Sequence, residues 1–227
     1  MNISNFLIMR HEILLLILIL VLLVGEIFVS ENKKINIIHT AIFLFGLHTV
    51  IGFLPLEESG LFGGSFQTTG LIHFFKNVLN VGVFILLLQS ADWIKEKMNQ
   101  QQSGLEFIIL LFSSLLGMYF MISSGDFLMF YIGLELSTLP VAALAAYETT
   151  KRSSSEAGIK LILSAALASG VSLFGISLLY ATTGSIFFND IIEVISVSNL
   201  TILGFILFFA GLSFKISLVP FHFWTAD

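Results

Sequence analysis

The stretch Ile13-Leu-Leu-Leu-Ile-Leu-Ile-Leu-Val-Leu-Leu-Val24 is apolar at every position, and the mainly apolar sequence continues to Val29. A helix needs about 20 such residues to cross the hydrocarbon core of a bilayer. The strands of a membrane β-barrel would instead alternate polar and apolar residues. No cleavage motif follows the run, so we expect it to remain as a first transmembrane helix. The stretch therefore predicts an all-α polytopic membrane protein.

The composition of the whole chain agrees with this fold class. Of 227 residues, 56% are hydrophobic and 11% are charged, which leaves too little polar surface to coat a water-soluble globule. The sequence has no cysteine, which excludes thiolate-bound iron–sulfur clusters, disulfides and cysteine nucleophiles. The net charge of −5 gives no sign of nucleic-acid binding.

Apolar segments between polar breaks predict about seven transmembrane helices. The predicted spans are 11–29, 37–54, 71–91, 105–122, 127–147, 156–181 and 200–222. Basic residues occupy every second loop, namely Lys33, Lys34, Lys95, Lys97, Lys151 and Arg152. By the positive-inside rule these loops are cytoplasmic and the N-terminus lies outside.

Glu135 lies near the middle of the predicted span 127–147, where it cannot reach water. A charged side chain at that depth costs on the order of 3 kcal/mol, so the carboxyl needs a compensating partner or a function. One interpretation is a carboxyl group hydrogen-bonded to a neighbouring helix. The other is a functional proton-binding group, which is the usual role of acids inside membranes.

Lys215 lies five residues before Pro220 in the last predicted span. Proline lacks an N–H and crowds the carbonyl of Ile216, so we expect a kink or break beside the lysine. Such interruptions are typical of transporter sites, although the lysine could also extend toward the headgroups. His222 follows the proline and is either a proton relay or a neighbour of Trp224 in an interfacial aromatic belt.

Lys76 and Lys160 each lie a few residues inside a predicted span, so for either residue alone we expect the side chain to extend toward the membrane surface. Glu106, at the start of its span, is on its own an interfacial charge. A stripe of small residues beneath Lys160 predicts close packing of a neighbouring helix. The stripe consists of Ser164, Ala168, Ser172 and Gly175.

Three segments together carry a family resemblance. In order, they are Asp126-x8-Glu135-Leu-x3-Pro140, Ser154-Ser-Glu-Ala-Gly-Ile-Lys160 and Phe214-Lys-x4-Pro-Phe-His-x-Trp-x2-Asp227. With them the chain resembles the antiporter-like membrane subunits of respiratory complex I. The resemblance implies three peripheral helices, within residues 1–104, followed by two inverted five-helix repeats, each with a broken central helix. Residues 105–227 would form an incomplete first repeat, whose seventh helix is broken near Pro220.

The resemblance also implies roles for particular residues. Glu135 and Lys215 match the family's paired acid and lysine, and Lys160 matches the lysine that links them along a proton path. Glu106 and Asp227 match further acidic positions of that path.

The implied activity is proton translocation coupled to quinone reduction elsewhere in a bacterial NADH:quinone oxidoreductase of the inner (plasma) membrane. The chain would act as a subunit of that translocase, in contact with the bilayer and with other membrane subunits. It would carry no cofactor, because NADH, flavin, iron–sulfur clusters and quinone are expected on other subunits.

Three alternatives remain open from the sequence. Subunits of multisubunit cation/proton antiporters resemble the same family, and their transport would depend on Na+ in place of NADH. Seven helices with a lysine in the last one are also found in retinal-binding proteins, which are coloured. A passive membrane scaffold would tolerate replacement of its buried charges.

Overall fold

The computed structural model describes residues 7–29, 31–56, 58–99 and 104–222. In this part of the chain there are eight α-helices, a short hairpin and one 3-10 turn. The helices are α2 (Arg10–Phe28), α3 (Glu31–Gly52), α4 (Gly70–Asn99), α5 (Gly104–Ile122), α6 (Phe127–Ala145), α7 (Arg152–Thr183), α8 (Phe188–Val194) and α9 (Asn199–Lys215). The hairpin strands are β1 (Ser59–Leu61) and β2 (Phe66–Thr68), joined by the 3-10 turn η1 (Phe62–Gly64).

Six of these helices, α2 to α7, are long and apolar enough to cross a membrane. They coincide with the first six predicted spans, so the prediction of an all-α, multi-pass membrane protein is confirmed. Large apolar side chains cover their outer faces, as lipid contact requires. Leu163 and Leu167 of α7, for example, are 67% and 70% exposed.

The seventh predicted span, 200–222, is wrong at its C-terminal end. Helix α9 has 17 residues and stops at Lys215, so it falls short of the length of a span. The backbone then leaves the helix through turns, and Ser217 adopts a positive φ of 56°. Pro220 explains the stop, because a helix continued through it would clash with the carbonyl of Ile216. The break is where the sequence predicts one, but it ends the helix completely.

Two small elements in the loops that contain no Lys or Arg, 55–70 and 182–199, were not predicted. Gly63 and Gly64 adopt positive φ angles of 68° and 101° in the turn that joins the paired strands β1 and β2. The hairpin also pairs with the turn between α5 and α6, because Gln67 N–H donates to the Ser123 carbonyl at 2.8 Å. The second element, α8, occupies the loop before α9. Both are too short to show a helical or strand period in the sequence.

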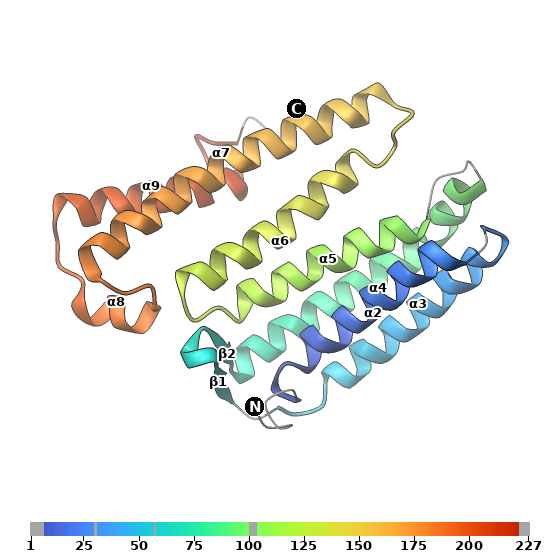
Figure 1. Cartoon of the computed structure of the whole chain (residues 1–227), viewed down its shortest axis with the longest axis horizontal. Helices are drawn as coiled ribbons and strands as arrows, with labels where there is room; N and C mark the ends of the chain where they lie inside the picture. The colour runs from blue at the N-terminus through green and yellow to red at the C-terminus, as the bar shows by residue number, and fades with distance from the viewer. Residues whose placement is uncertain (1–6, 30, 57, 100–103, 223–227) are drawn as a thin grey trace.

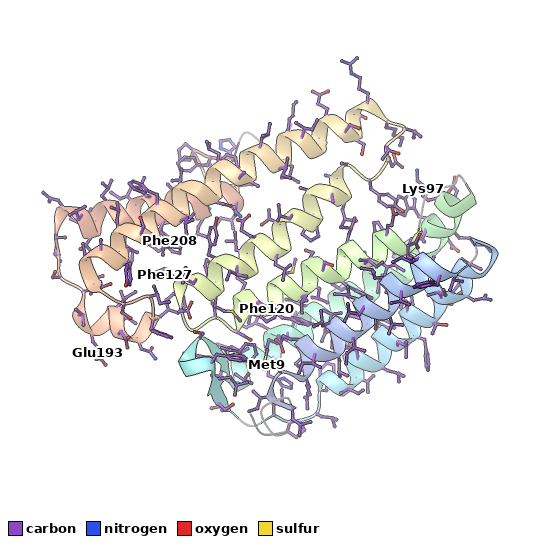
Figure 2. The ribbon with its side chains drawn as sticks, viewed as in Figure 1. Met9, Lys97, Phe120, Phe127, Glu193 and Phe208 are labelled. Atoms are coloured by element: carbon purple, nitrogen blue, oxygen red, sulfur yellow. The ribbon has the colours of Figure 1, made fainter. Side chains whose placement is uncertain are left out.

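The helices form two groups with α6 between them (Figure 1). Helices α2 to α5 pack around buried side chains such as Leu15, Phe45 and Phe112. Helices α7 and α9 pack together beside α8, around a smaller cluster that includes Phe127 and Phe208 (Figure 2). Helix α6 lies along α5 on one side and contacts α7 on the other.

Small residues allow the closest helix contacts. A Cβ atom on Gly133 of α6 would meet the Met121 backbone and lie 2.9 Å from the Gly117 carbonyl of α5. Between α7 and α9, the Ser172 hydroxyl donates to the Phe208 carbonyl at 3.3 Å. Ala168, Ser172 and Gly175 of the predicted stripe all face α9, so the predicted helix packing is confirmed for these three residues.

The basic loops meet at one end of the molecule. Lys97, at the end of α4, and Lys151 both form ion pairs with Glu148 in the connection between α6 and α7. Figure 2 shows Lys97 at that end, and Figure 1 shows the end of α2 and the start of α3 on the same side. This arrangement agrees with the alternation of basic loops. The side of the membrane that this end faces remains a prediction.

Candidate functional site

The side chains of Glu135 and Lys215 form an ion pair between α6 and α9. Lys215 Nζ donates to Glu135 Oε1 at 2.8 Å. The lysine side chain is 11% exposed and the glutamate 24% exposed. The two residues are 80 positions apart in sequence, so only the packing of the helices brings them together.

Local sequence features set the position of each partner. Asp126 caps the N-terminus of α6 by accepting a hydrogen bond from Met129 N–H at 2.7 Å, and Glu135 follows two and a half turns later. Lys215 is the last residue of α9. A cation at a helix C-terminus is stabilised by the helix dipole, so the break before Pro220 favours an ammonium group at this position.

Two hydroxyl groups complete the surroundings of the pair. The Ser169 hydroxyl of α7 lies within hydrogen-bond range of Glu135 Oε1 and is also 2.8 Å from the Ala165 carbonyl, so it can donate to either. Lys215 Nζ lies 3.3 Å from Thr138 Oγ1, one turn beyond Glu135. Both charged groups therefore have uncharged polar neighbours as well as each other.

A cavity of about 470 Å³ adjoins Lys215 and lies between α5, α6, α7 and α9. Its walls are largely apolar and include Met118, Leu134 and Leu161, with Thr138 and Lys215 on one side. Charge interactions are strong in such surroundings because little water screens them. The arrangement can hold a proton on the lysine or pass it to the carboxylate, and any nearby change of charge would alter that balance.

Comparisons with known proteins identify the family. The family model described as NADH:quinone oxidoreductase/Mrp antiporter, transmembrane, matches residues 124–227, which include both Glu135 and Lys215. The chain is 40% identical over 227 residues to NADH-quinone oxidoreductase subunit N of Phocaeicola vulgatus, covering 100% of this chain and 48% of that protein. It is 44% identical over 230 residues to subunit N of Azobacteroides pseudotrichonymphae, again over 100% of this chain and 48% of the relative. The chain is a homologue of NADH-quinone oxidoreductase subunit N.

Solved structures agree with this assignment. A chain in respiratory complex I from Thermus thermophilus with bound aureothin superposes with a TM-score of 0.74 at 25% identity, over 95% of this chain and 46% of that chain. A chain of the archaeal membrane-bound sulfane sulfur reductase shares the fold alone, with a TM-score of 0.69 at 18% identity. The subunit N homologue spans about half the length of the relatives that it matches. The resemblance to antiporter-like subunits of complex I is confirmed.

Lys160, which the resemblance places on the proton path, lies apart from the ion pair in this homologue. Its ammonium group is 3.2 Å from Glu156 Oε1, one turn earlier on α7, and its side chain is 47% exposed. Lys160 precedes Ser169 by nine residues, which is half a turn out of phase on a helix. The two side chains therefore leave α7 in opposite directions, and the role of Lys160 remains a prediction.

Of the other predicted path residues, Glu106 lies far along α5 from the level of the pair, His222 is exposed, and Asp227 is not described. Glu106 is exposed in the first turn of α5. Along α5, Glu106 lies eleven residues before Gly117, a rise of roughly 16 Å. Gly117 packs against α6, the helix that carries Glu135. His222 is exposed in the turn after Pro220. Asp227 lies outside the described residues.

A second buried ion pair was missed in the sequence. Lys76 Nζ donates to Glu12 Oε1 at 2.5 Å, and both side chains are at most 3% exposed. The expectation that Lys76 extends toward the membrane surface is wrong, because Phe66 of the hairpin lies over its ammonium group at 5.0 Å. A usable signal was present. Glu12 lies at the start of the first span and Lys76 near the start of the third. These two spans run parallel in the predicted topology, so both residues lie at a similar depth in the membrane.

Outside the spans, Glu148 and Tyr147 form the polar end of the molecule. The neighbouring Lys151 and Lys97, which donate hydrogen bonds to Glu148, lower the pKa of its carboxyl group. Burial, together with the charges of Glu106 and Glu26, raises the pKa of the Tyr147 hydroxyl to about 12. At this end, two lysines therefore share the Glu148 carboxylate.

Proposed function

We propose that this chain is the N-terminal part of a proton-translocating membrane subunit of a bacterial NADH:quinone oxidoreductase, respiratory complex I. The observation that carries the proposal is the Glu135–Lys215 ion pair, which joins two helices at 2.8 Å inside the segment that the family model matches. An acid and a lysine facing each other beside a broken helix are typical of transporter sites.

The proposal includes a domain organisation. Helices α2 to α4, within residues 1–104, would form the peripheral helices. Residues 105–227 would belong to the first of two inverted five-helix repeats, with α9 as the first half of its broken helix. The end of α9 at Lys215 supports this assignment.

In the proposed mechanism, Lys215 holds a proton while Glu135 is ionised. Quinone reduction in other subunits would change the charge next to this pair. Because Coulomb energies are large in a poorly screened site, such a change shifts the balance between the two groups. Lys215 would then release its proton and later take up another, and Glu135 would hold the negative charge in between. The hydroxyl groups of Ser169 and Thr138 would hold the two side chains in place.

The remaining path residues would act farther from the pair. Lys160 would relay protons only with water or another helix between it and Lys215, since its side chain leaves α7 on the opposite side from Ser169. Glu106, His222 and Asp227 are candidates for the ends of the path. NADH, flavin, iron–sulfur clusters and quinone would bind to other subunits. The basic loops would lie on the cytoplasmic side of the inner membrane.

A subunit of a multisubunit cation/proton antiporter is the second candidate, because the matching family model also names Mrp antiporters. The two candidates differ in their driving force. An antiporter would exchange Na+ for protons without NADH, whereas a complex I subunit would move protons only during NADH oxidation. Identities of 40% and 44% to two subunit N relatives, each over the whole of this chain, favour complex I.

The test uses the full-length native subunit in inverted membrane vesicles. Glu135→Gln and Lys215→Ala should abolish NADH-driven proton uptake while the amount of assembled complex stays normal. Glu193→Gln is the matched control, because Glu193 is an exposed residue of α8, away from the pair. Normal uptake and normal NADH oxidation in both variants would refute the proposal, and proton exchange driven by Na+ alone would favour the antiporter.

A further inference from the structure

A buried polar cluster fills the space between α2, α3, α4 and α5, on the side of α5 away from Glu135. It is built from titratable and amide side chains that are almost fully shielded from solvent. Its members are His11, Glu12, His48, Lys76, Asn80 and Tyr119, none of which is more than 4% exposed. Buried polar groups of this kind are costly unless they are paired or serve a function.

The centre of the cluster is the Glu12–Lys76 pair. This pair repeats the chemistry of the Glu135–Lys215 site, with one carboxylate and one ammonium group on facing helices, but it is more deeply buried. The ammonium group also lies 5.9 Å from the ring of Tyr119, which reaches in from α5. Glu12 Oε2 is buried and has no hydrogen-bond partner among the described residues. The carboxylate therefore keeps one oxygen able to accept a proton.

A chain of hydrogen bonds leads from the interior of this cluster toward the surface. His48 Nε2 lies 3.3 Å from the Tyr119 hydroxyl, which donates to Asn80 Oδ1. Asn80 Nδ2 lies 3.5 Å from His11 Nδ1, and His11 Nε2 lies 3.1 Å from His73 Nδ1. Because the nearby Arg10 guanidinium can only donate to His73 Nε2, the proton of neutral His73 lies on Nδ1 and points at His11 Nε2.

His73 connects this chain to the surface. It is half-buried and lines a groove of about 410 Å³ with Phe53, Gly70 and Asn77. Arg10 lies beside it, with its guanidinium 3.4 Å from His73 Nε2 and bound to the Gly52 carbonyl at 3.1 Å. Asn77 Oδ1 is buried at this groove without a hydrogen-bond partner in the described residues.

We infer that Glu12, Lys76 and the His11–His73 pair form a second proton-binding site, loaded from the hairpin side of the molecule through His73. A proton arriving at His73 passes to His11 when the Nδ1–H bond of His73 breaks and an Nε2–H bond forms on His11. Transfer from Lys76 Nζ to Glu12 Oε1 turns the ion pair into a neutral amine and a neutral acid without changing the total charge. The Glu12–Lys76 pair thus exists as an ion pair or as a neutral pair, and the additional proton resides on His73 or His11.

The experiment follows the Glu12 carboxyl group by infrared spectroscopy of membranes that contain the assembled complex. Lys76→Met, or Lys76→Gln if the first variant fails to assemble, removes the charge that keeps Glu12 ionised. A carboxylic acid C=O band should appear, and it should be absent after the additional change Glu12→Gln. On transfer to D2O this band should shift quickly when His73 is present and slowly in the Lys76→Met/His73→Phe double variant.

Lys97→Met is the matched control, because it breaks a lysine–glutamate pair at the other end of the same helix, where Glu148 stays in contact with water. This variant should give no new band. A missing band in assembled Lys76→Met or Lys76→Gln complex would overturn the inference. So would a deuterium shift whose rate does not depend on His73.

A contribution of this site to transport rests on the proposed function and has a separate test. Lys76→Met and His73→Phe should lower the number of protons taken up per NADH oxidised relative to Lys97→Met. If Glu135→Gln leaves transport intact while the deuterium shift still depends on His73, only the proposed function fails. If uptake matches that of Lys97→Met, the transport role of the second site is refuted.

Discussion

The two buried lysine–glutamate pairs differ in how readily their burial can be predicted from the sequence. Glu135 lies in the middle of an apolar span and Lys215 lies beside a proline, so each is conspicuous by itself. Lys76 and Glu12 lie near helix ends, where a surface position is the ordinary expectation. Phe66 of the hairpin helps to cover Lys76, together with Glu12 and Tyr119 of neighbouring helices, and a hairpin of three-residue strands leaves no periodic signal. Burial near a helix end is therefore decided by tertiary structure.

Ser169 gives a prediction at the residue scale. Ser169→Ala removes a hydroxyl group from Glu135 and leaves the carboxylate with Lys215 as its main partner. A hydrogen bond contributes about 1 kcal/mol, so the initial rate of NADH-driven proton uptake should fall by roughly fivefold. Ser177→Ala is the control, since that exposed hydroxyl donates to the Phe174 carbonyl within α7. Equal rates in the two variants would show that Ser169 does not support the pair.

Among the helices and strands, the sequence predicts the long apolar helices well and the short elements poorly. Spans α2 to α7 follow from length and hydropathy, which depend on local composition. The end of α9 follows from the chemistry of Pro220, but whether the helix bends or stops there depends on the turns beyond it. The direction of Lys160 could have been anticipated, because a separation of nine residues places it opposite Ser169 on any regular helix.

The contact between α5 and α6 leads to a prediction about glycine. Gly133→Ala would place a Cβ atom against the backbone of Met121, and such overpacking typically costs about 1–3 kcal/mol. We expect a lower unfolding temperature for the variant, measured on the purified complex. Gly82→Ala adds the same methyl group where nothing lies within 4 Å, and it should leave stability unchanged or raise it, because alanine favours helix. The same loss in both variants would contradict the close packing.

The connection between α4 and the α6–α7 turn leads to a prediction about pH. Lys151 and Lys97 lower the pKa of Glu148 in the folded protein, so the stabilisation that it provides is present above its unfolded pKa and is lost as the pH falls through the folded pKa. Glu148→Gln should therefore lower the unfolding temperature at neutral pH. The difference from the native protein should shrink once the pH falls below the ordinary pKa of a glutamate and should vanish below the lowered pKa of Glu148 in the folded protein. A difference that persists in acid would show that the ion pairs do not stabilise this end.

At the scale of the whole molecule, α5 and α6 separate two polar sites inside one membrane-spanning fold. One site lies between α6 and α9, in the segment that the family model matches, and the other lies among α2 to α5. The family motifs in the sequence indicated the first site because its residues lie within those motifs. They could not indicate the second, because none of the three segments lies in the first three helices, whose polar residues meet only after folding.

The central claim is that Lys215 gives up and regains a proton during transport. Lys215→Arg tests it most directly, because a guanidinium keeps the positive charge beside Glu135 but does not release its proton in proteins. The measurement is the number of protons taken up per NADH oxidised in inverted vesicles with normal amounts of assembled complex. We predict that uptake is lost in this variant. Uptake at the native ratio would contradict the account, because a permanent charge at position 215 would then be sufficient.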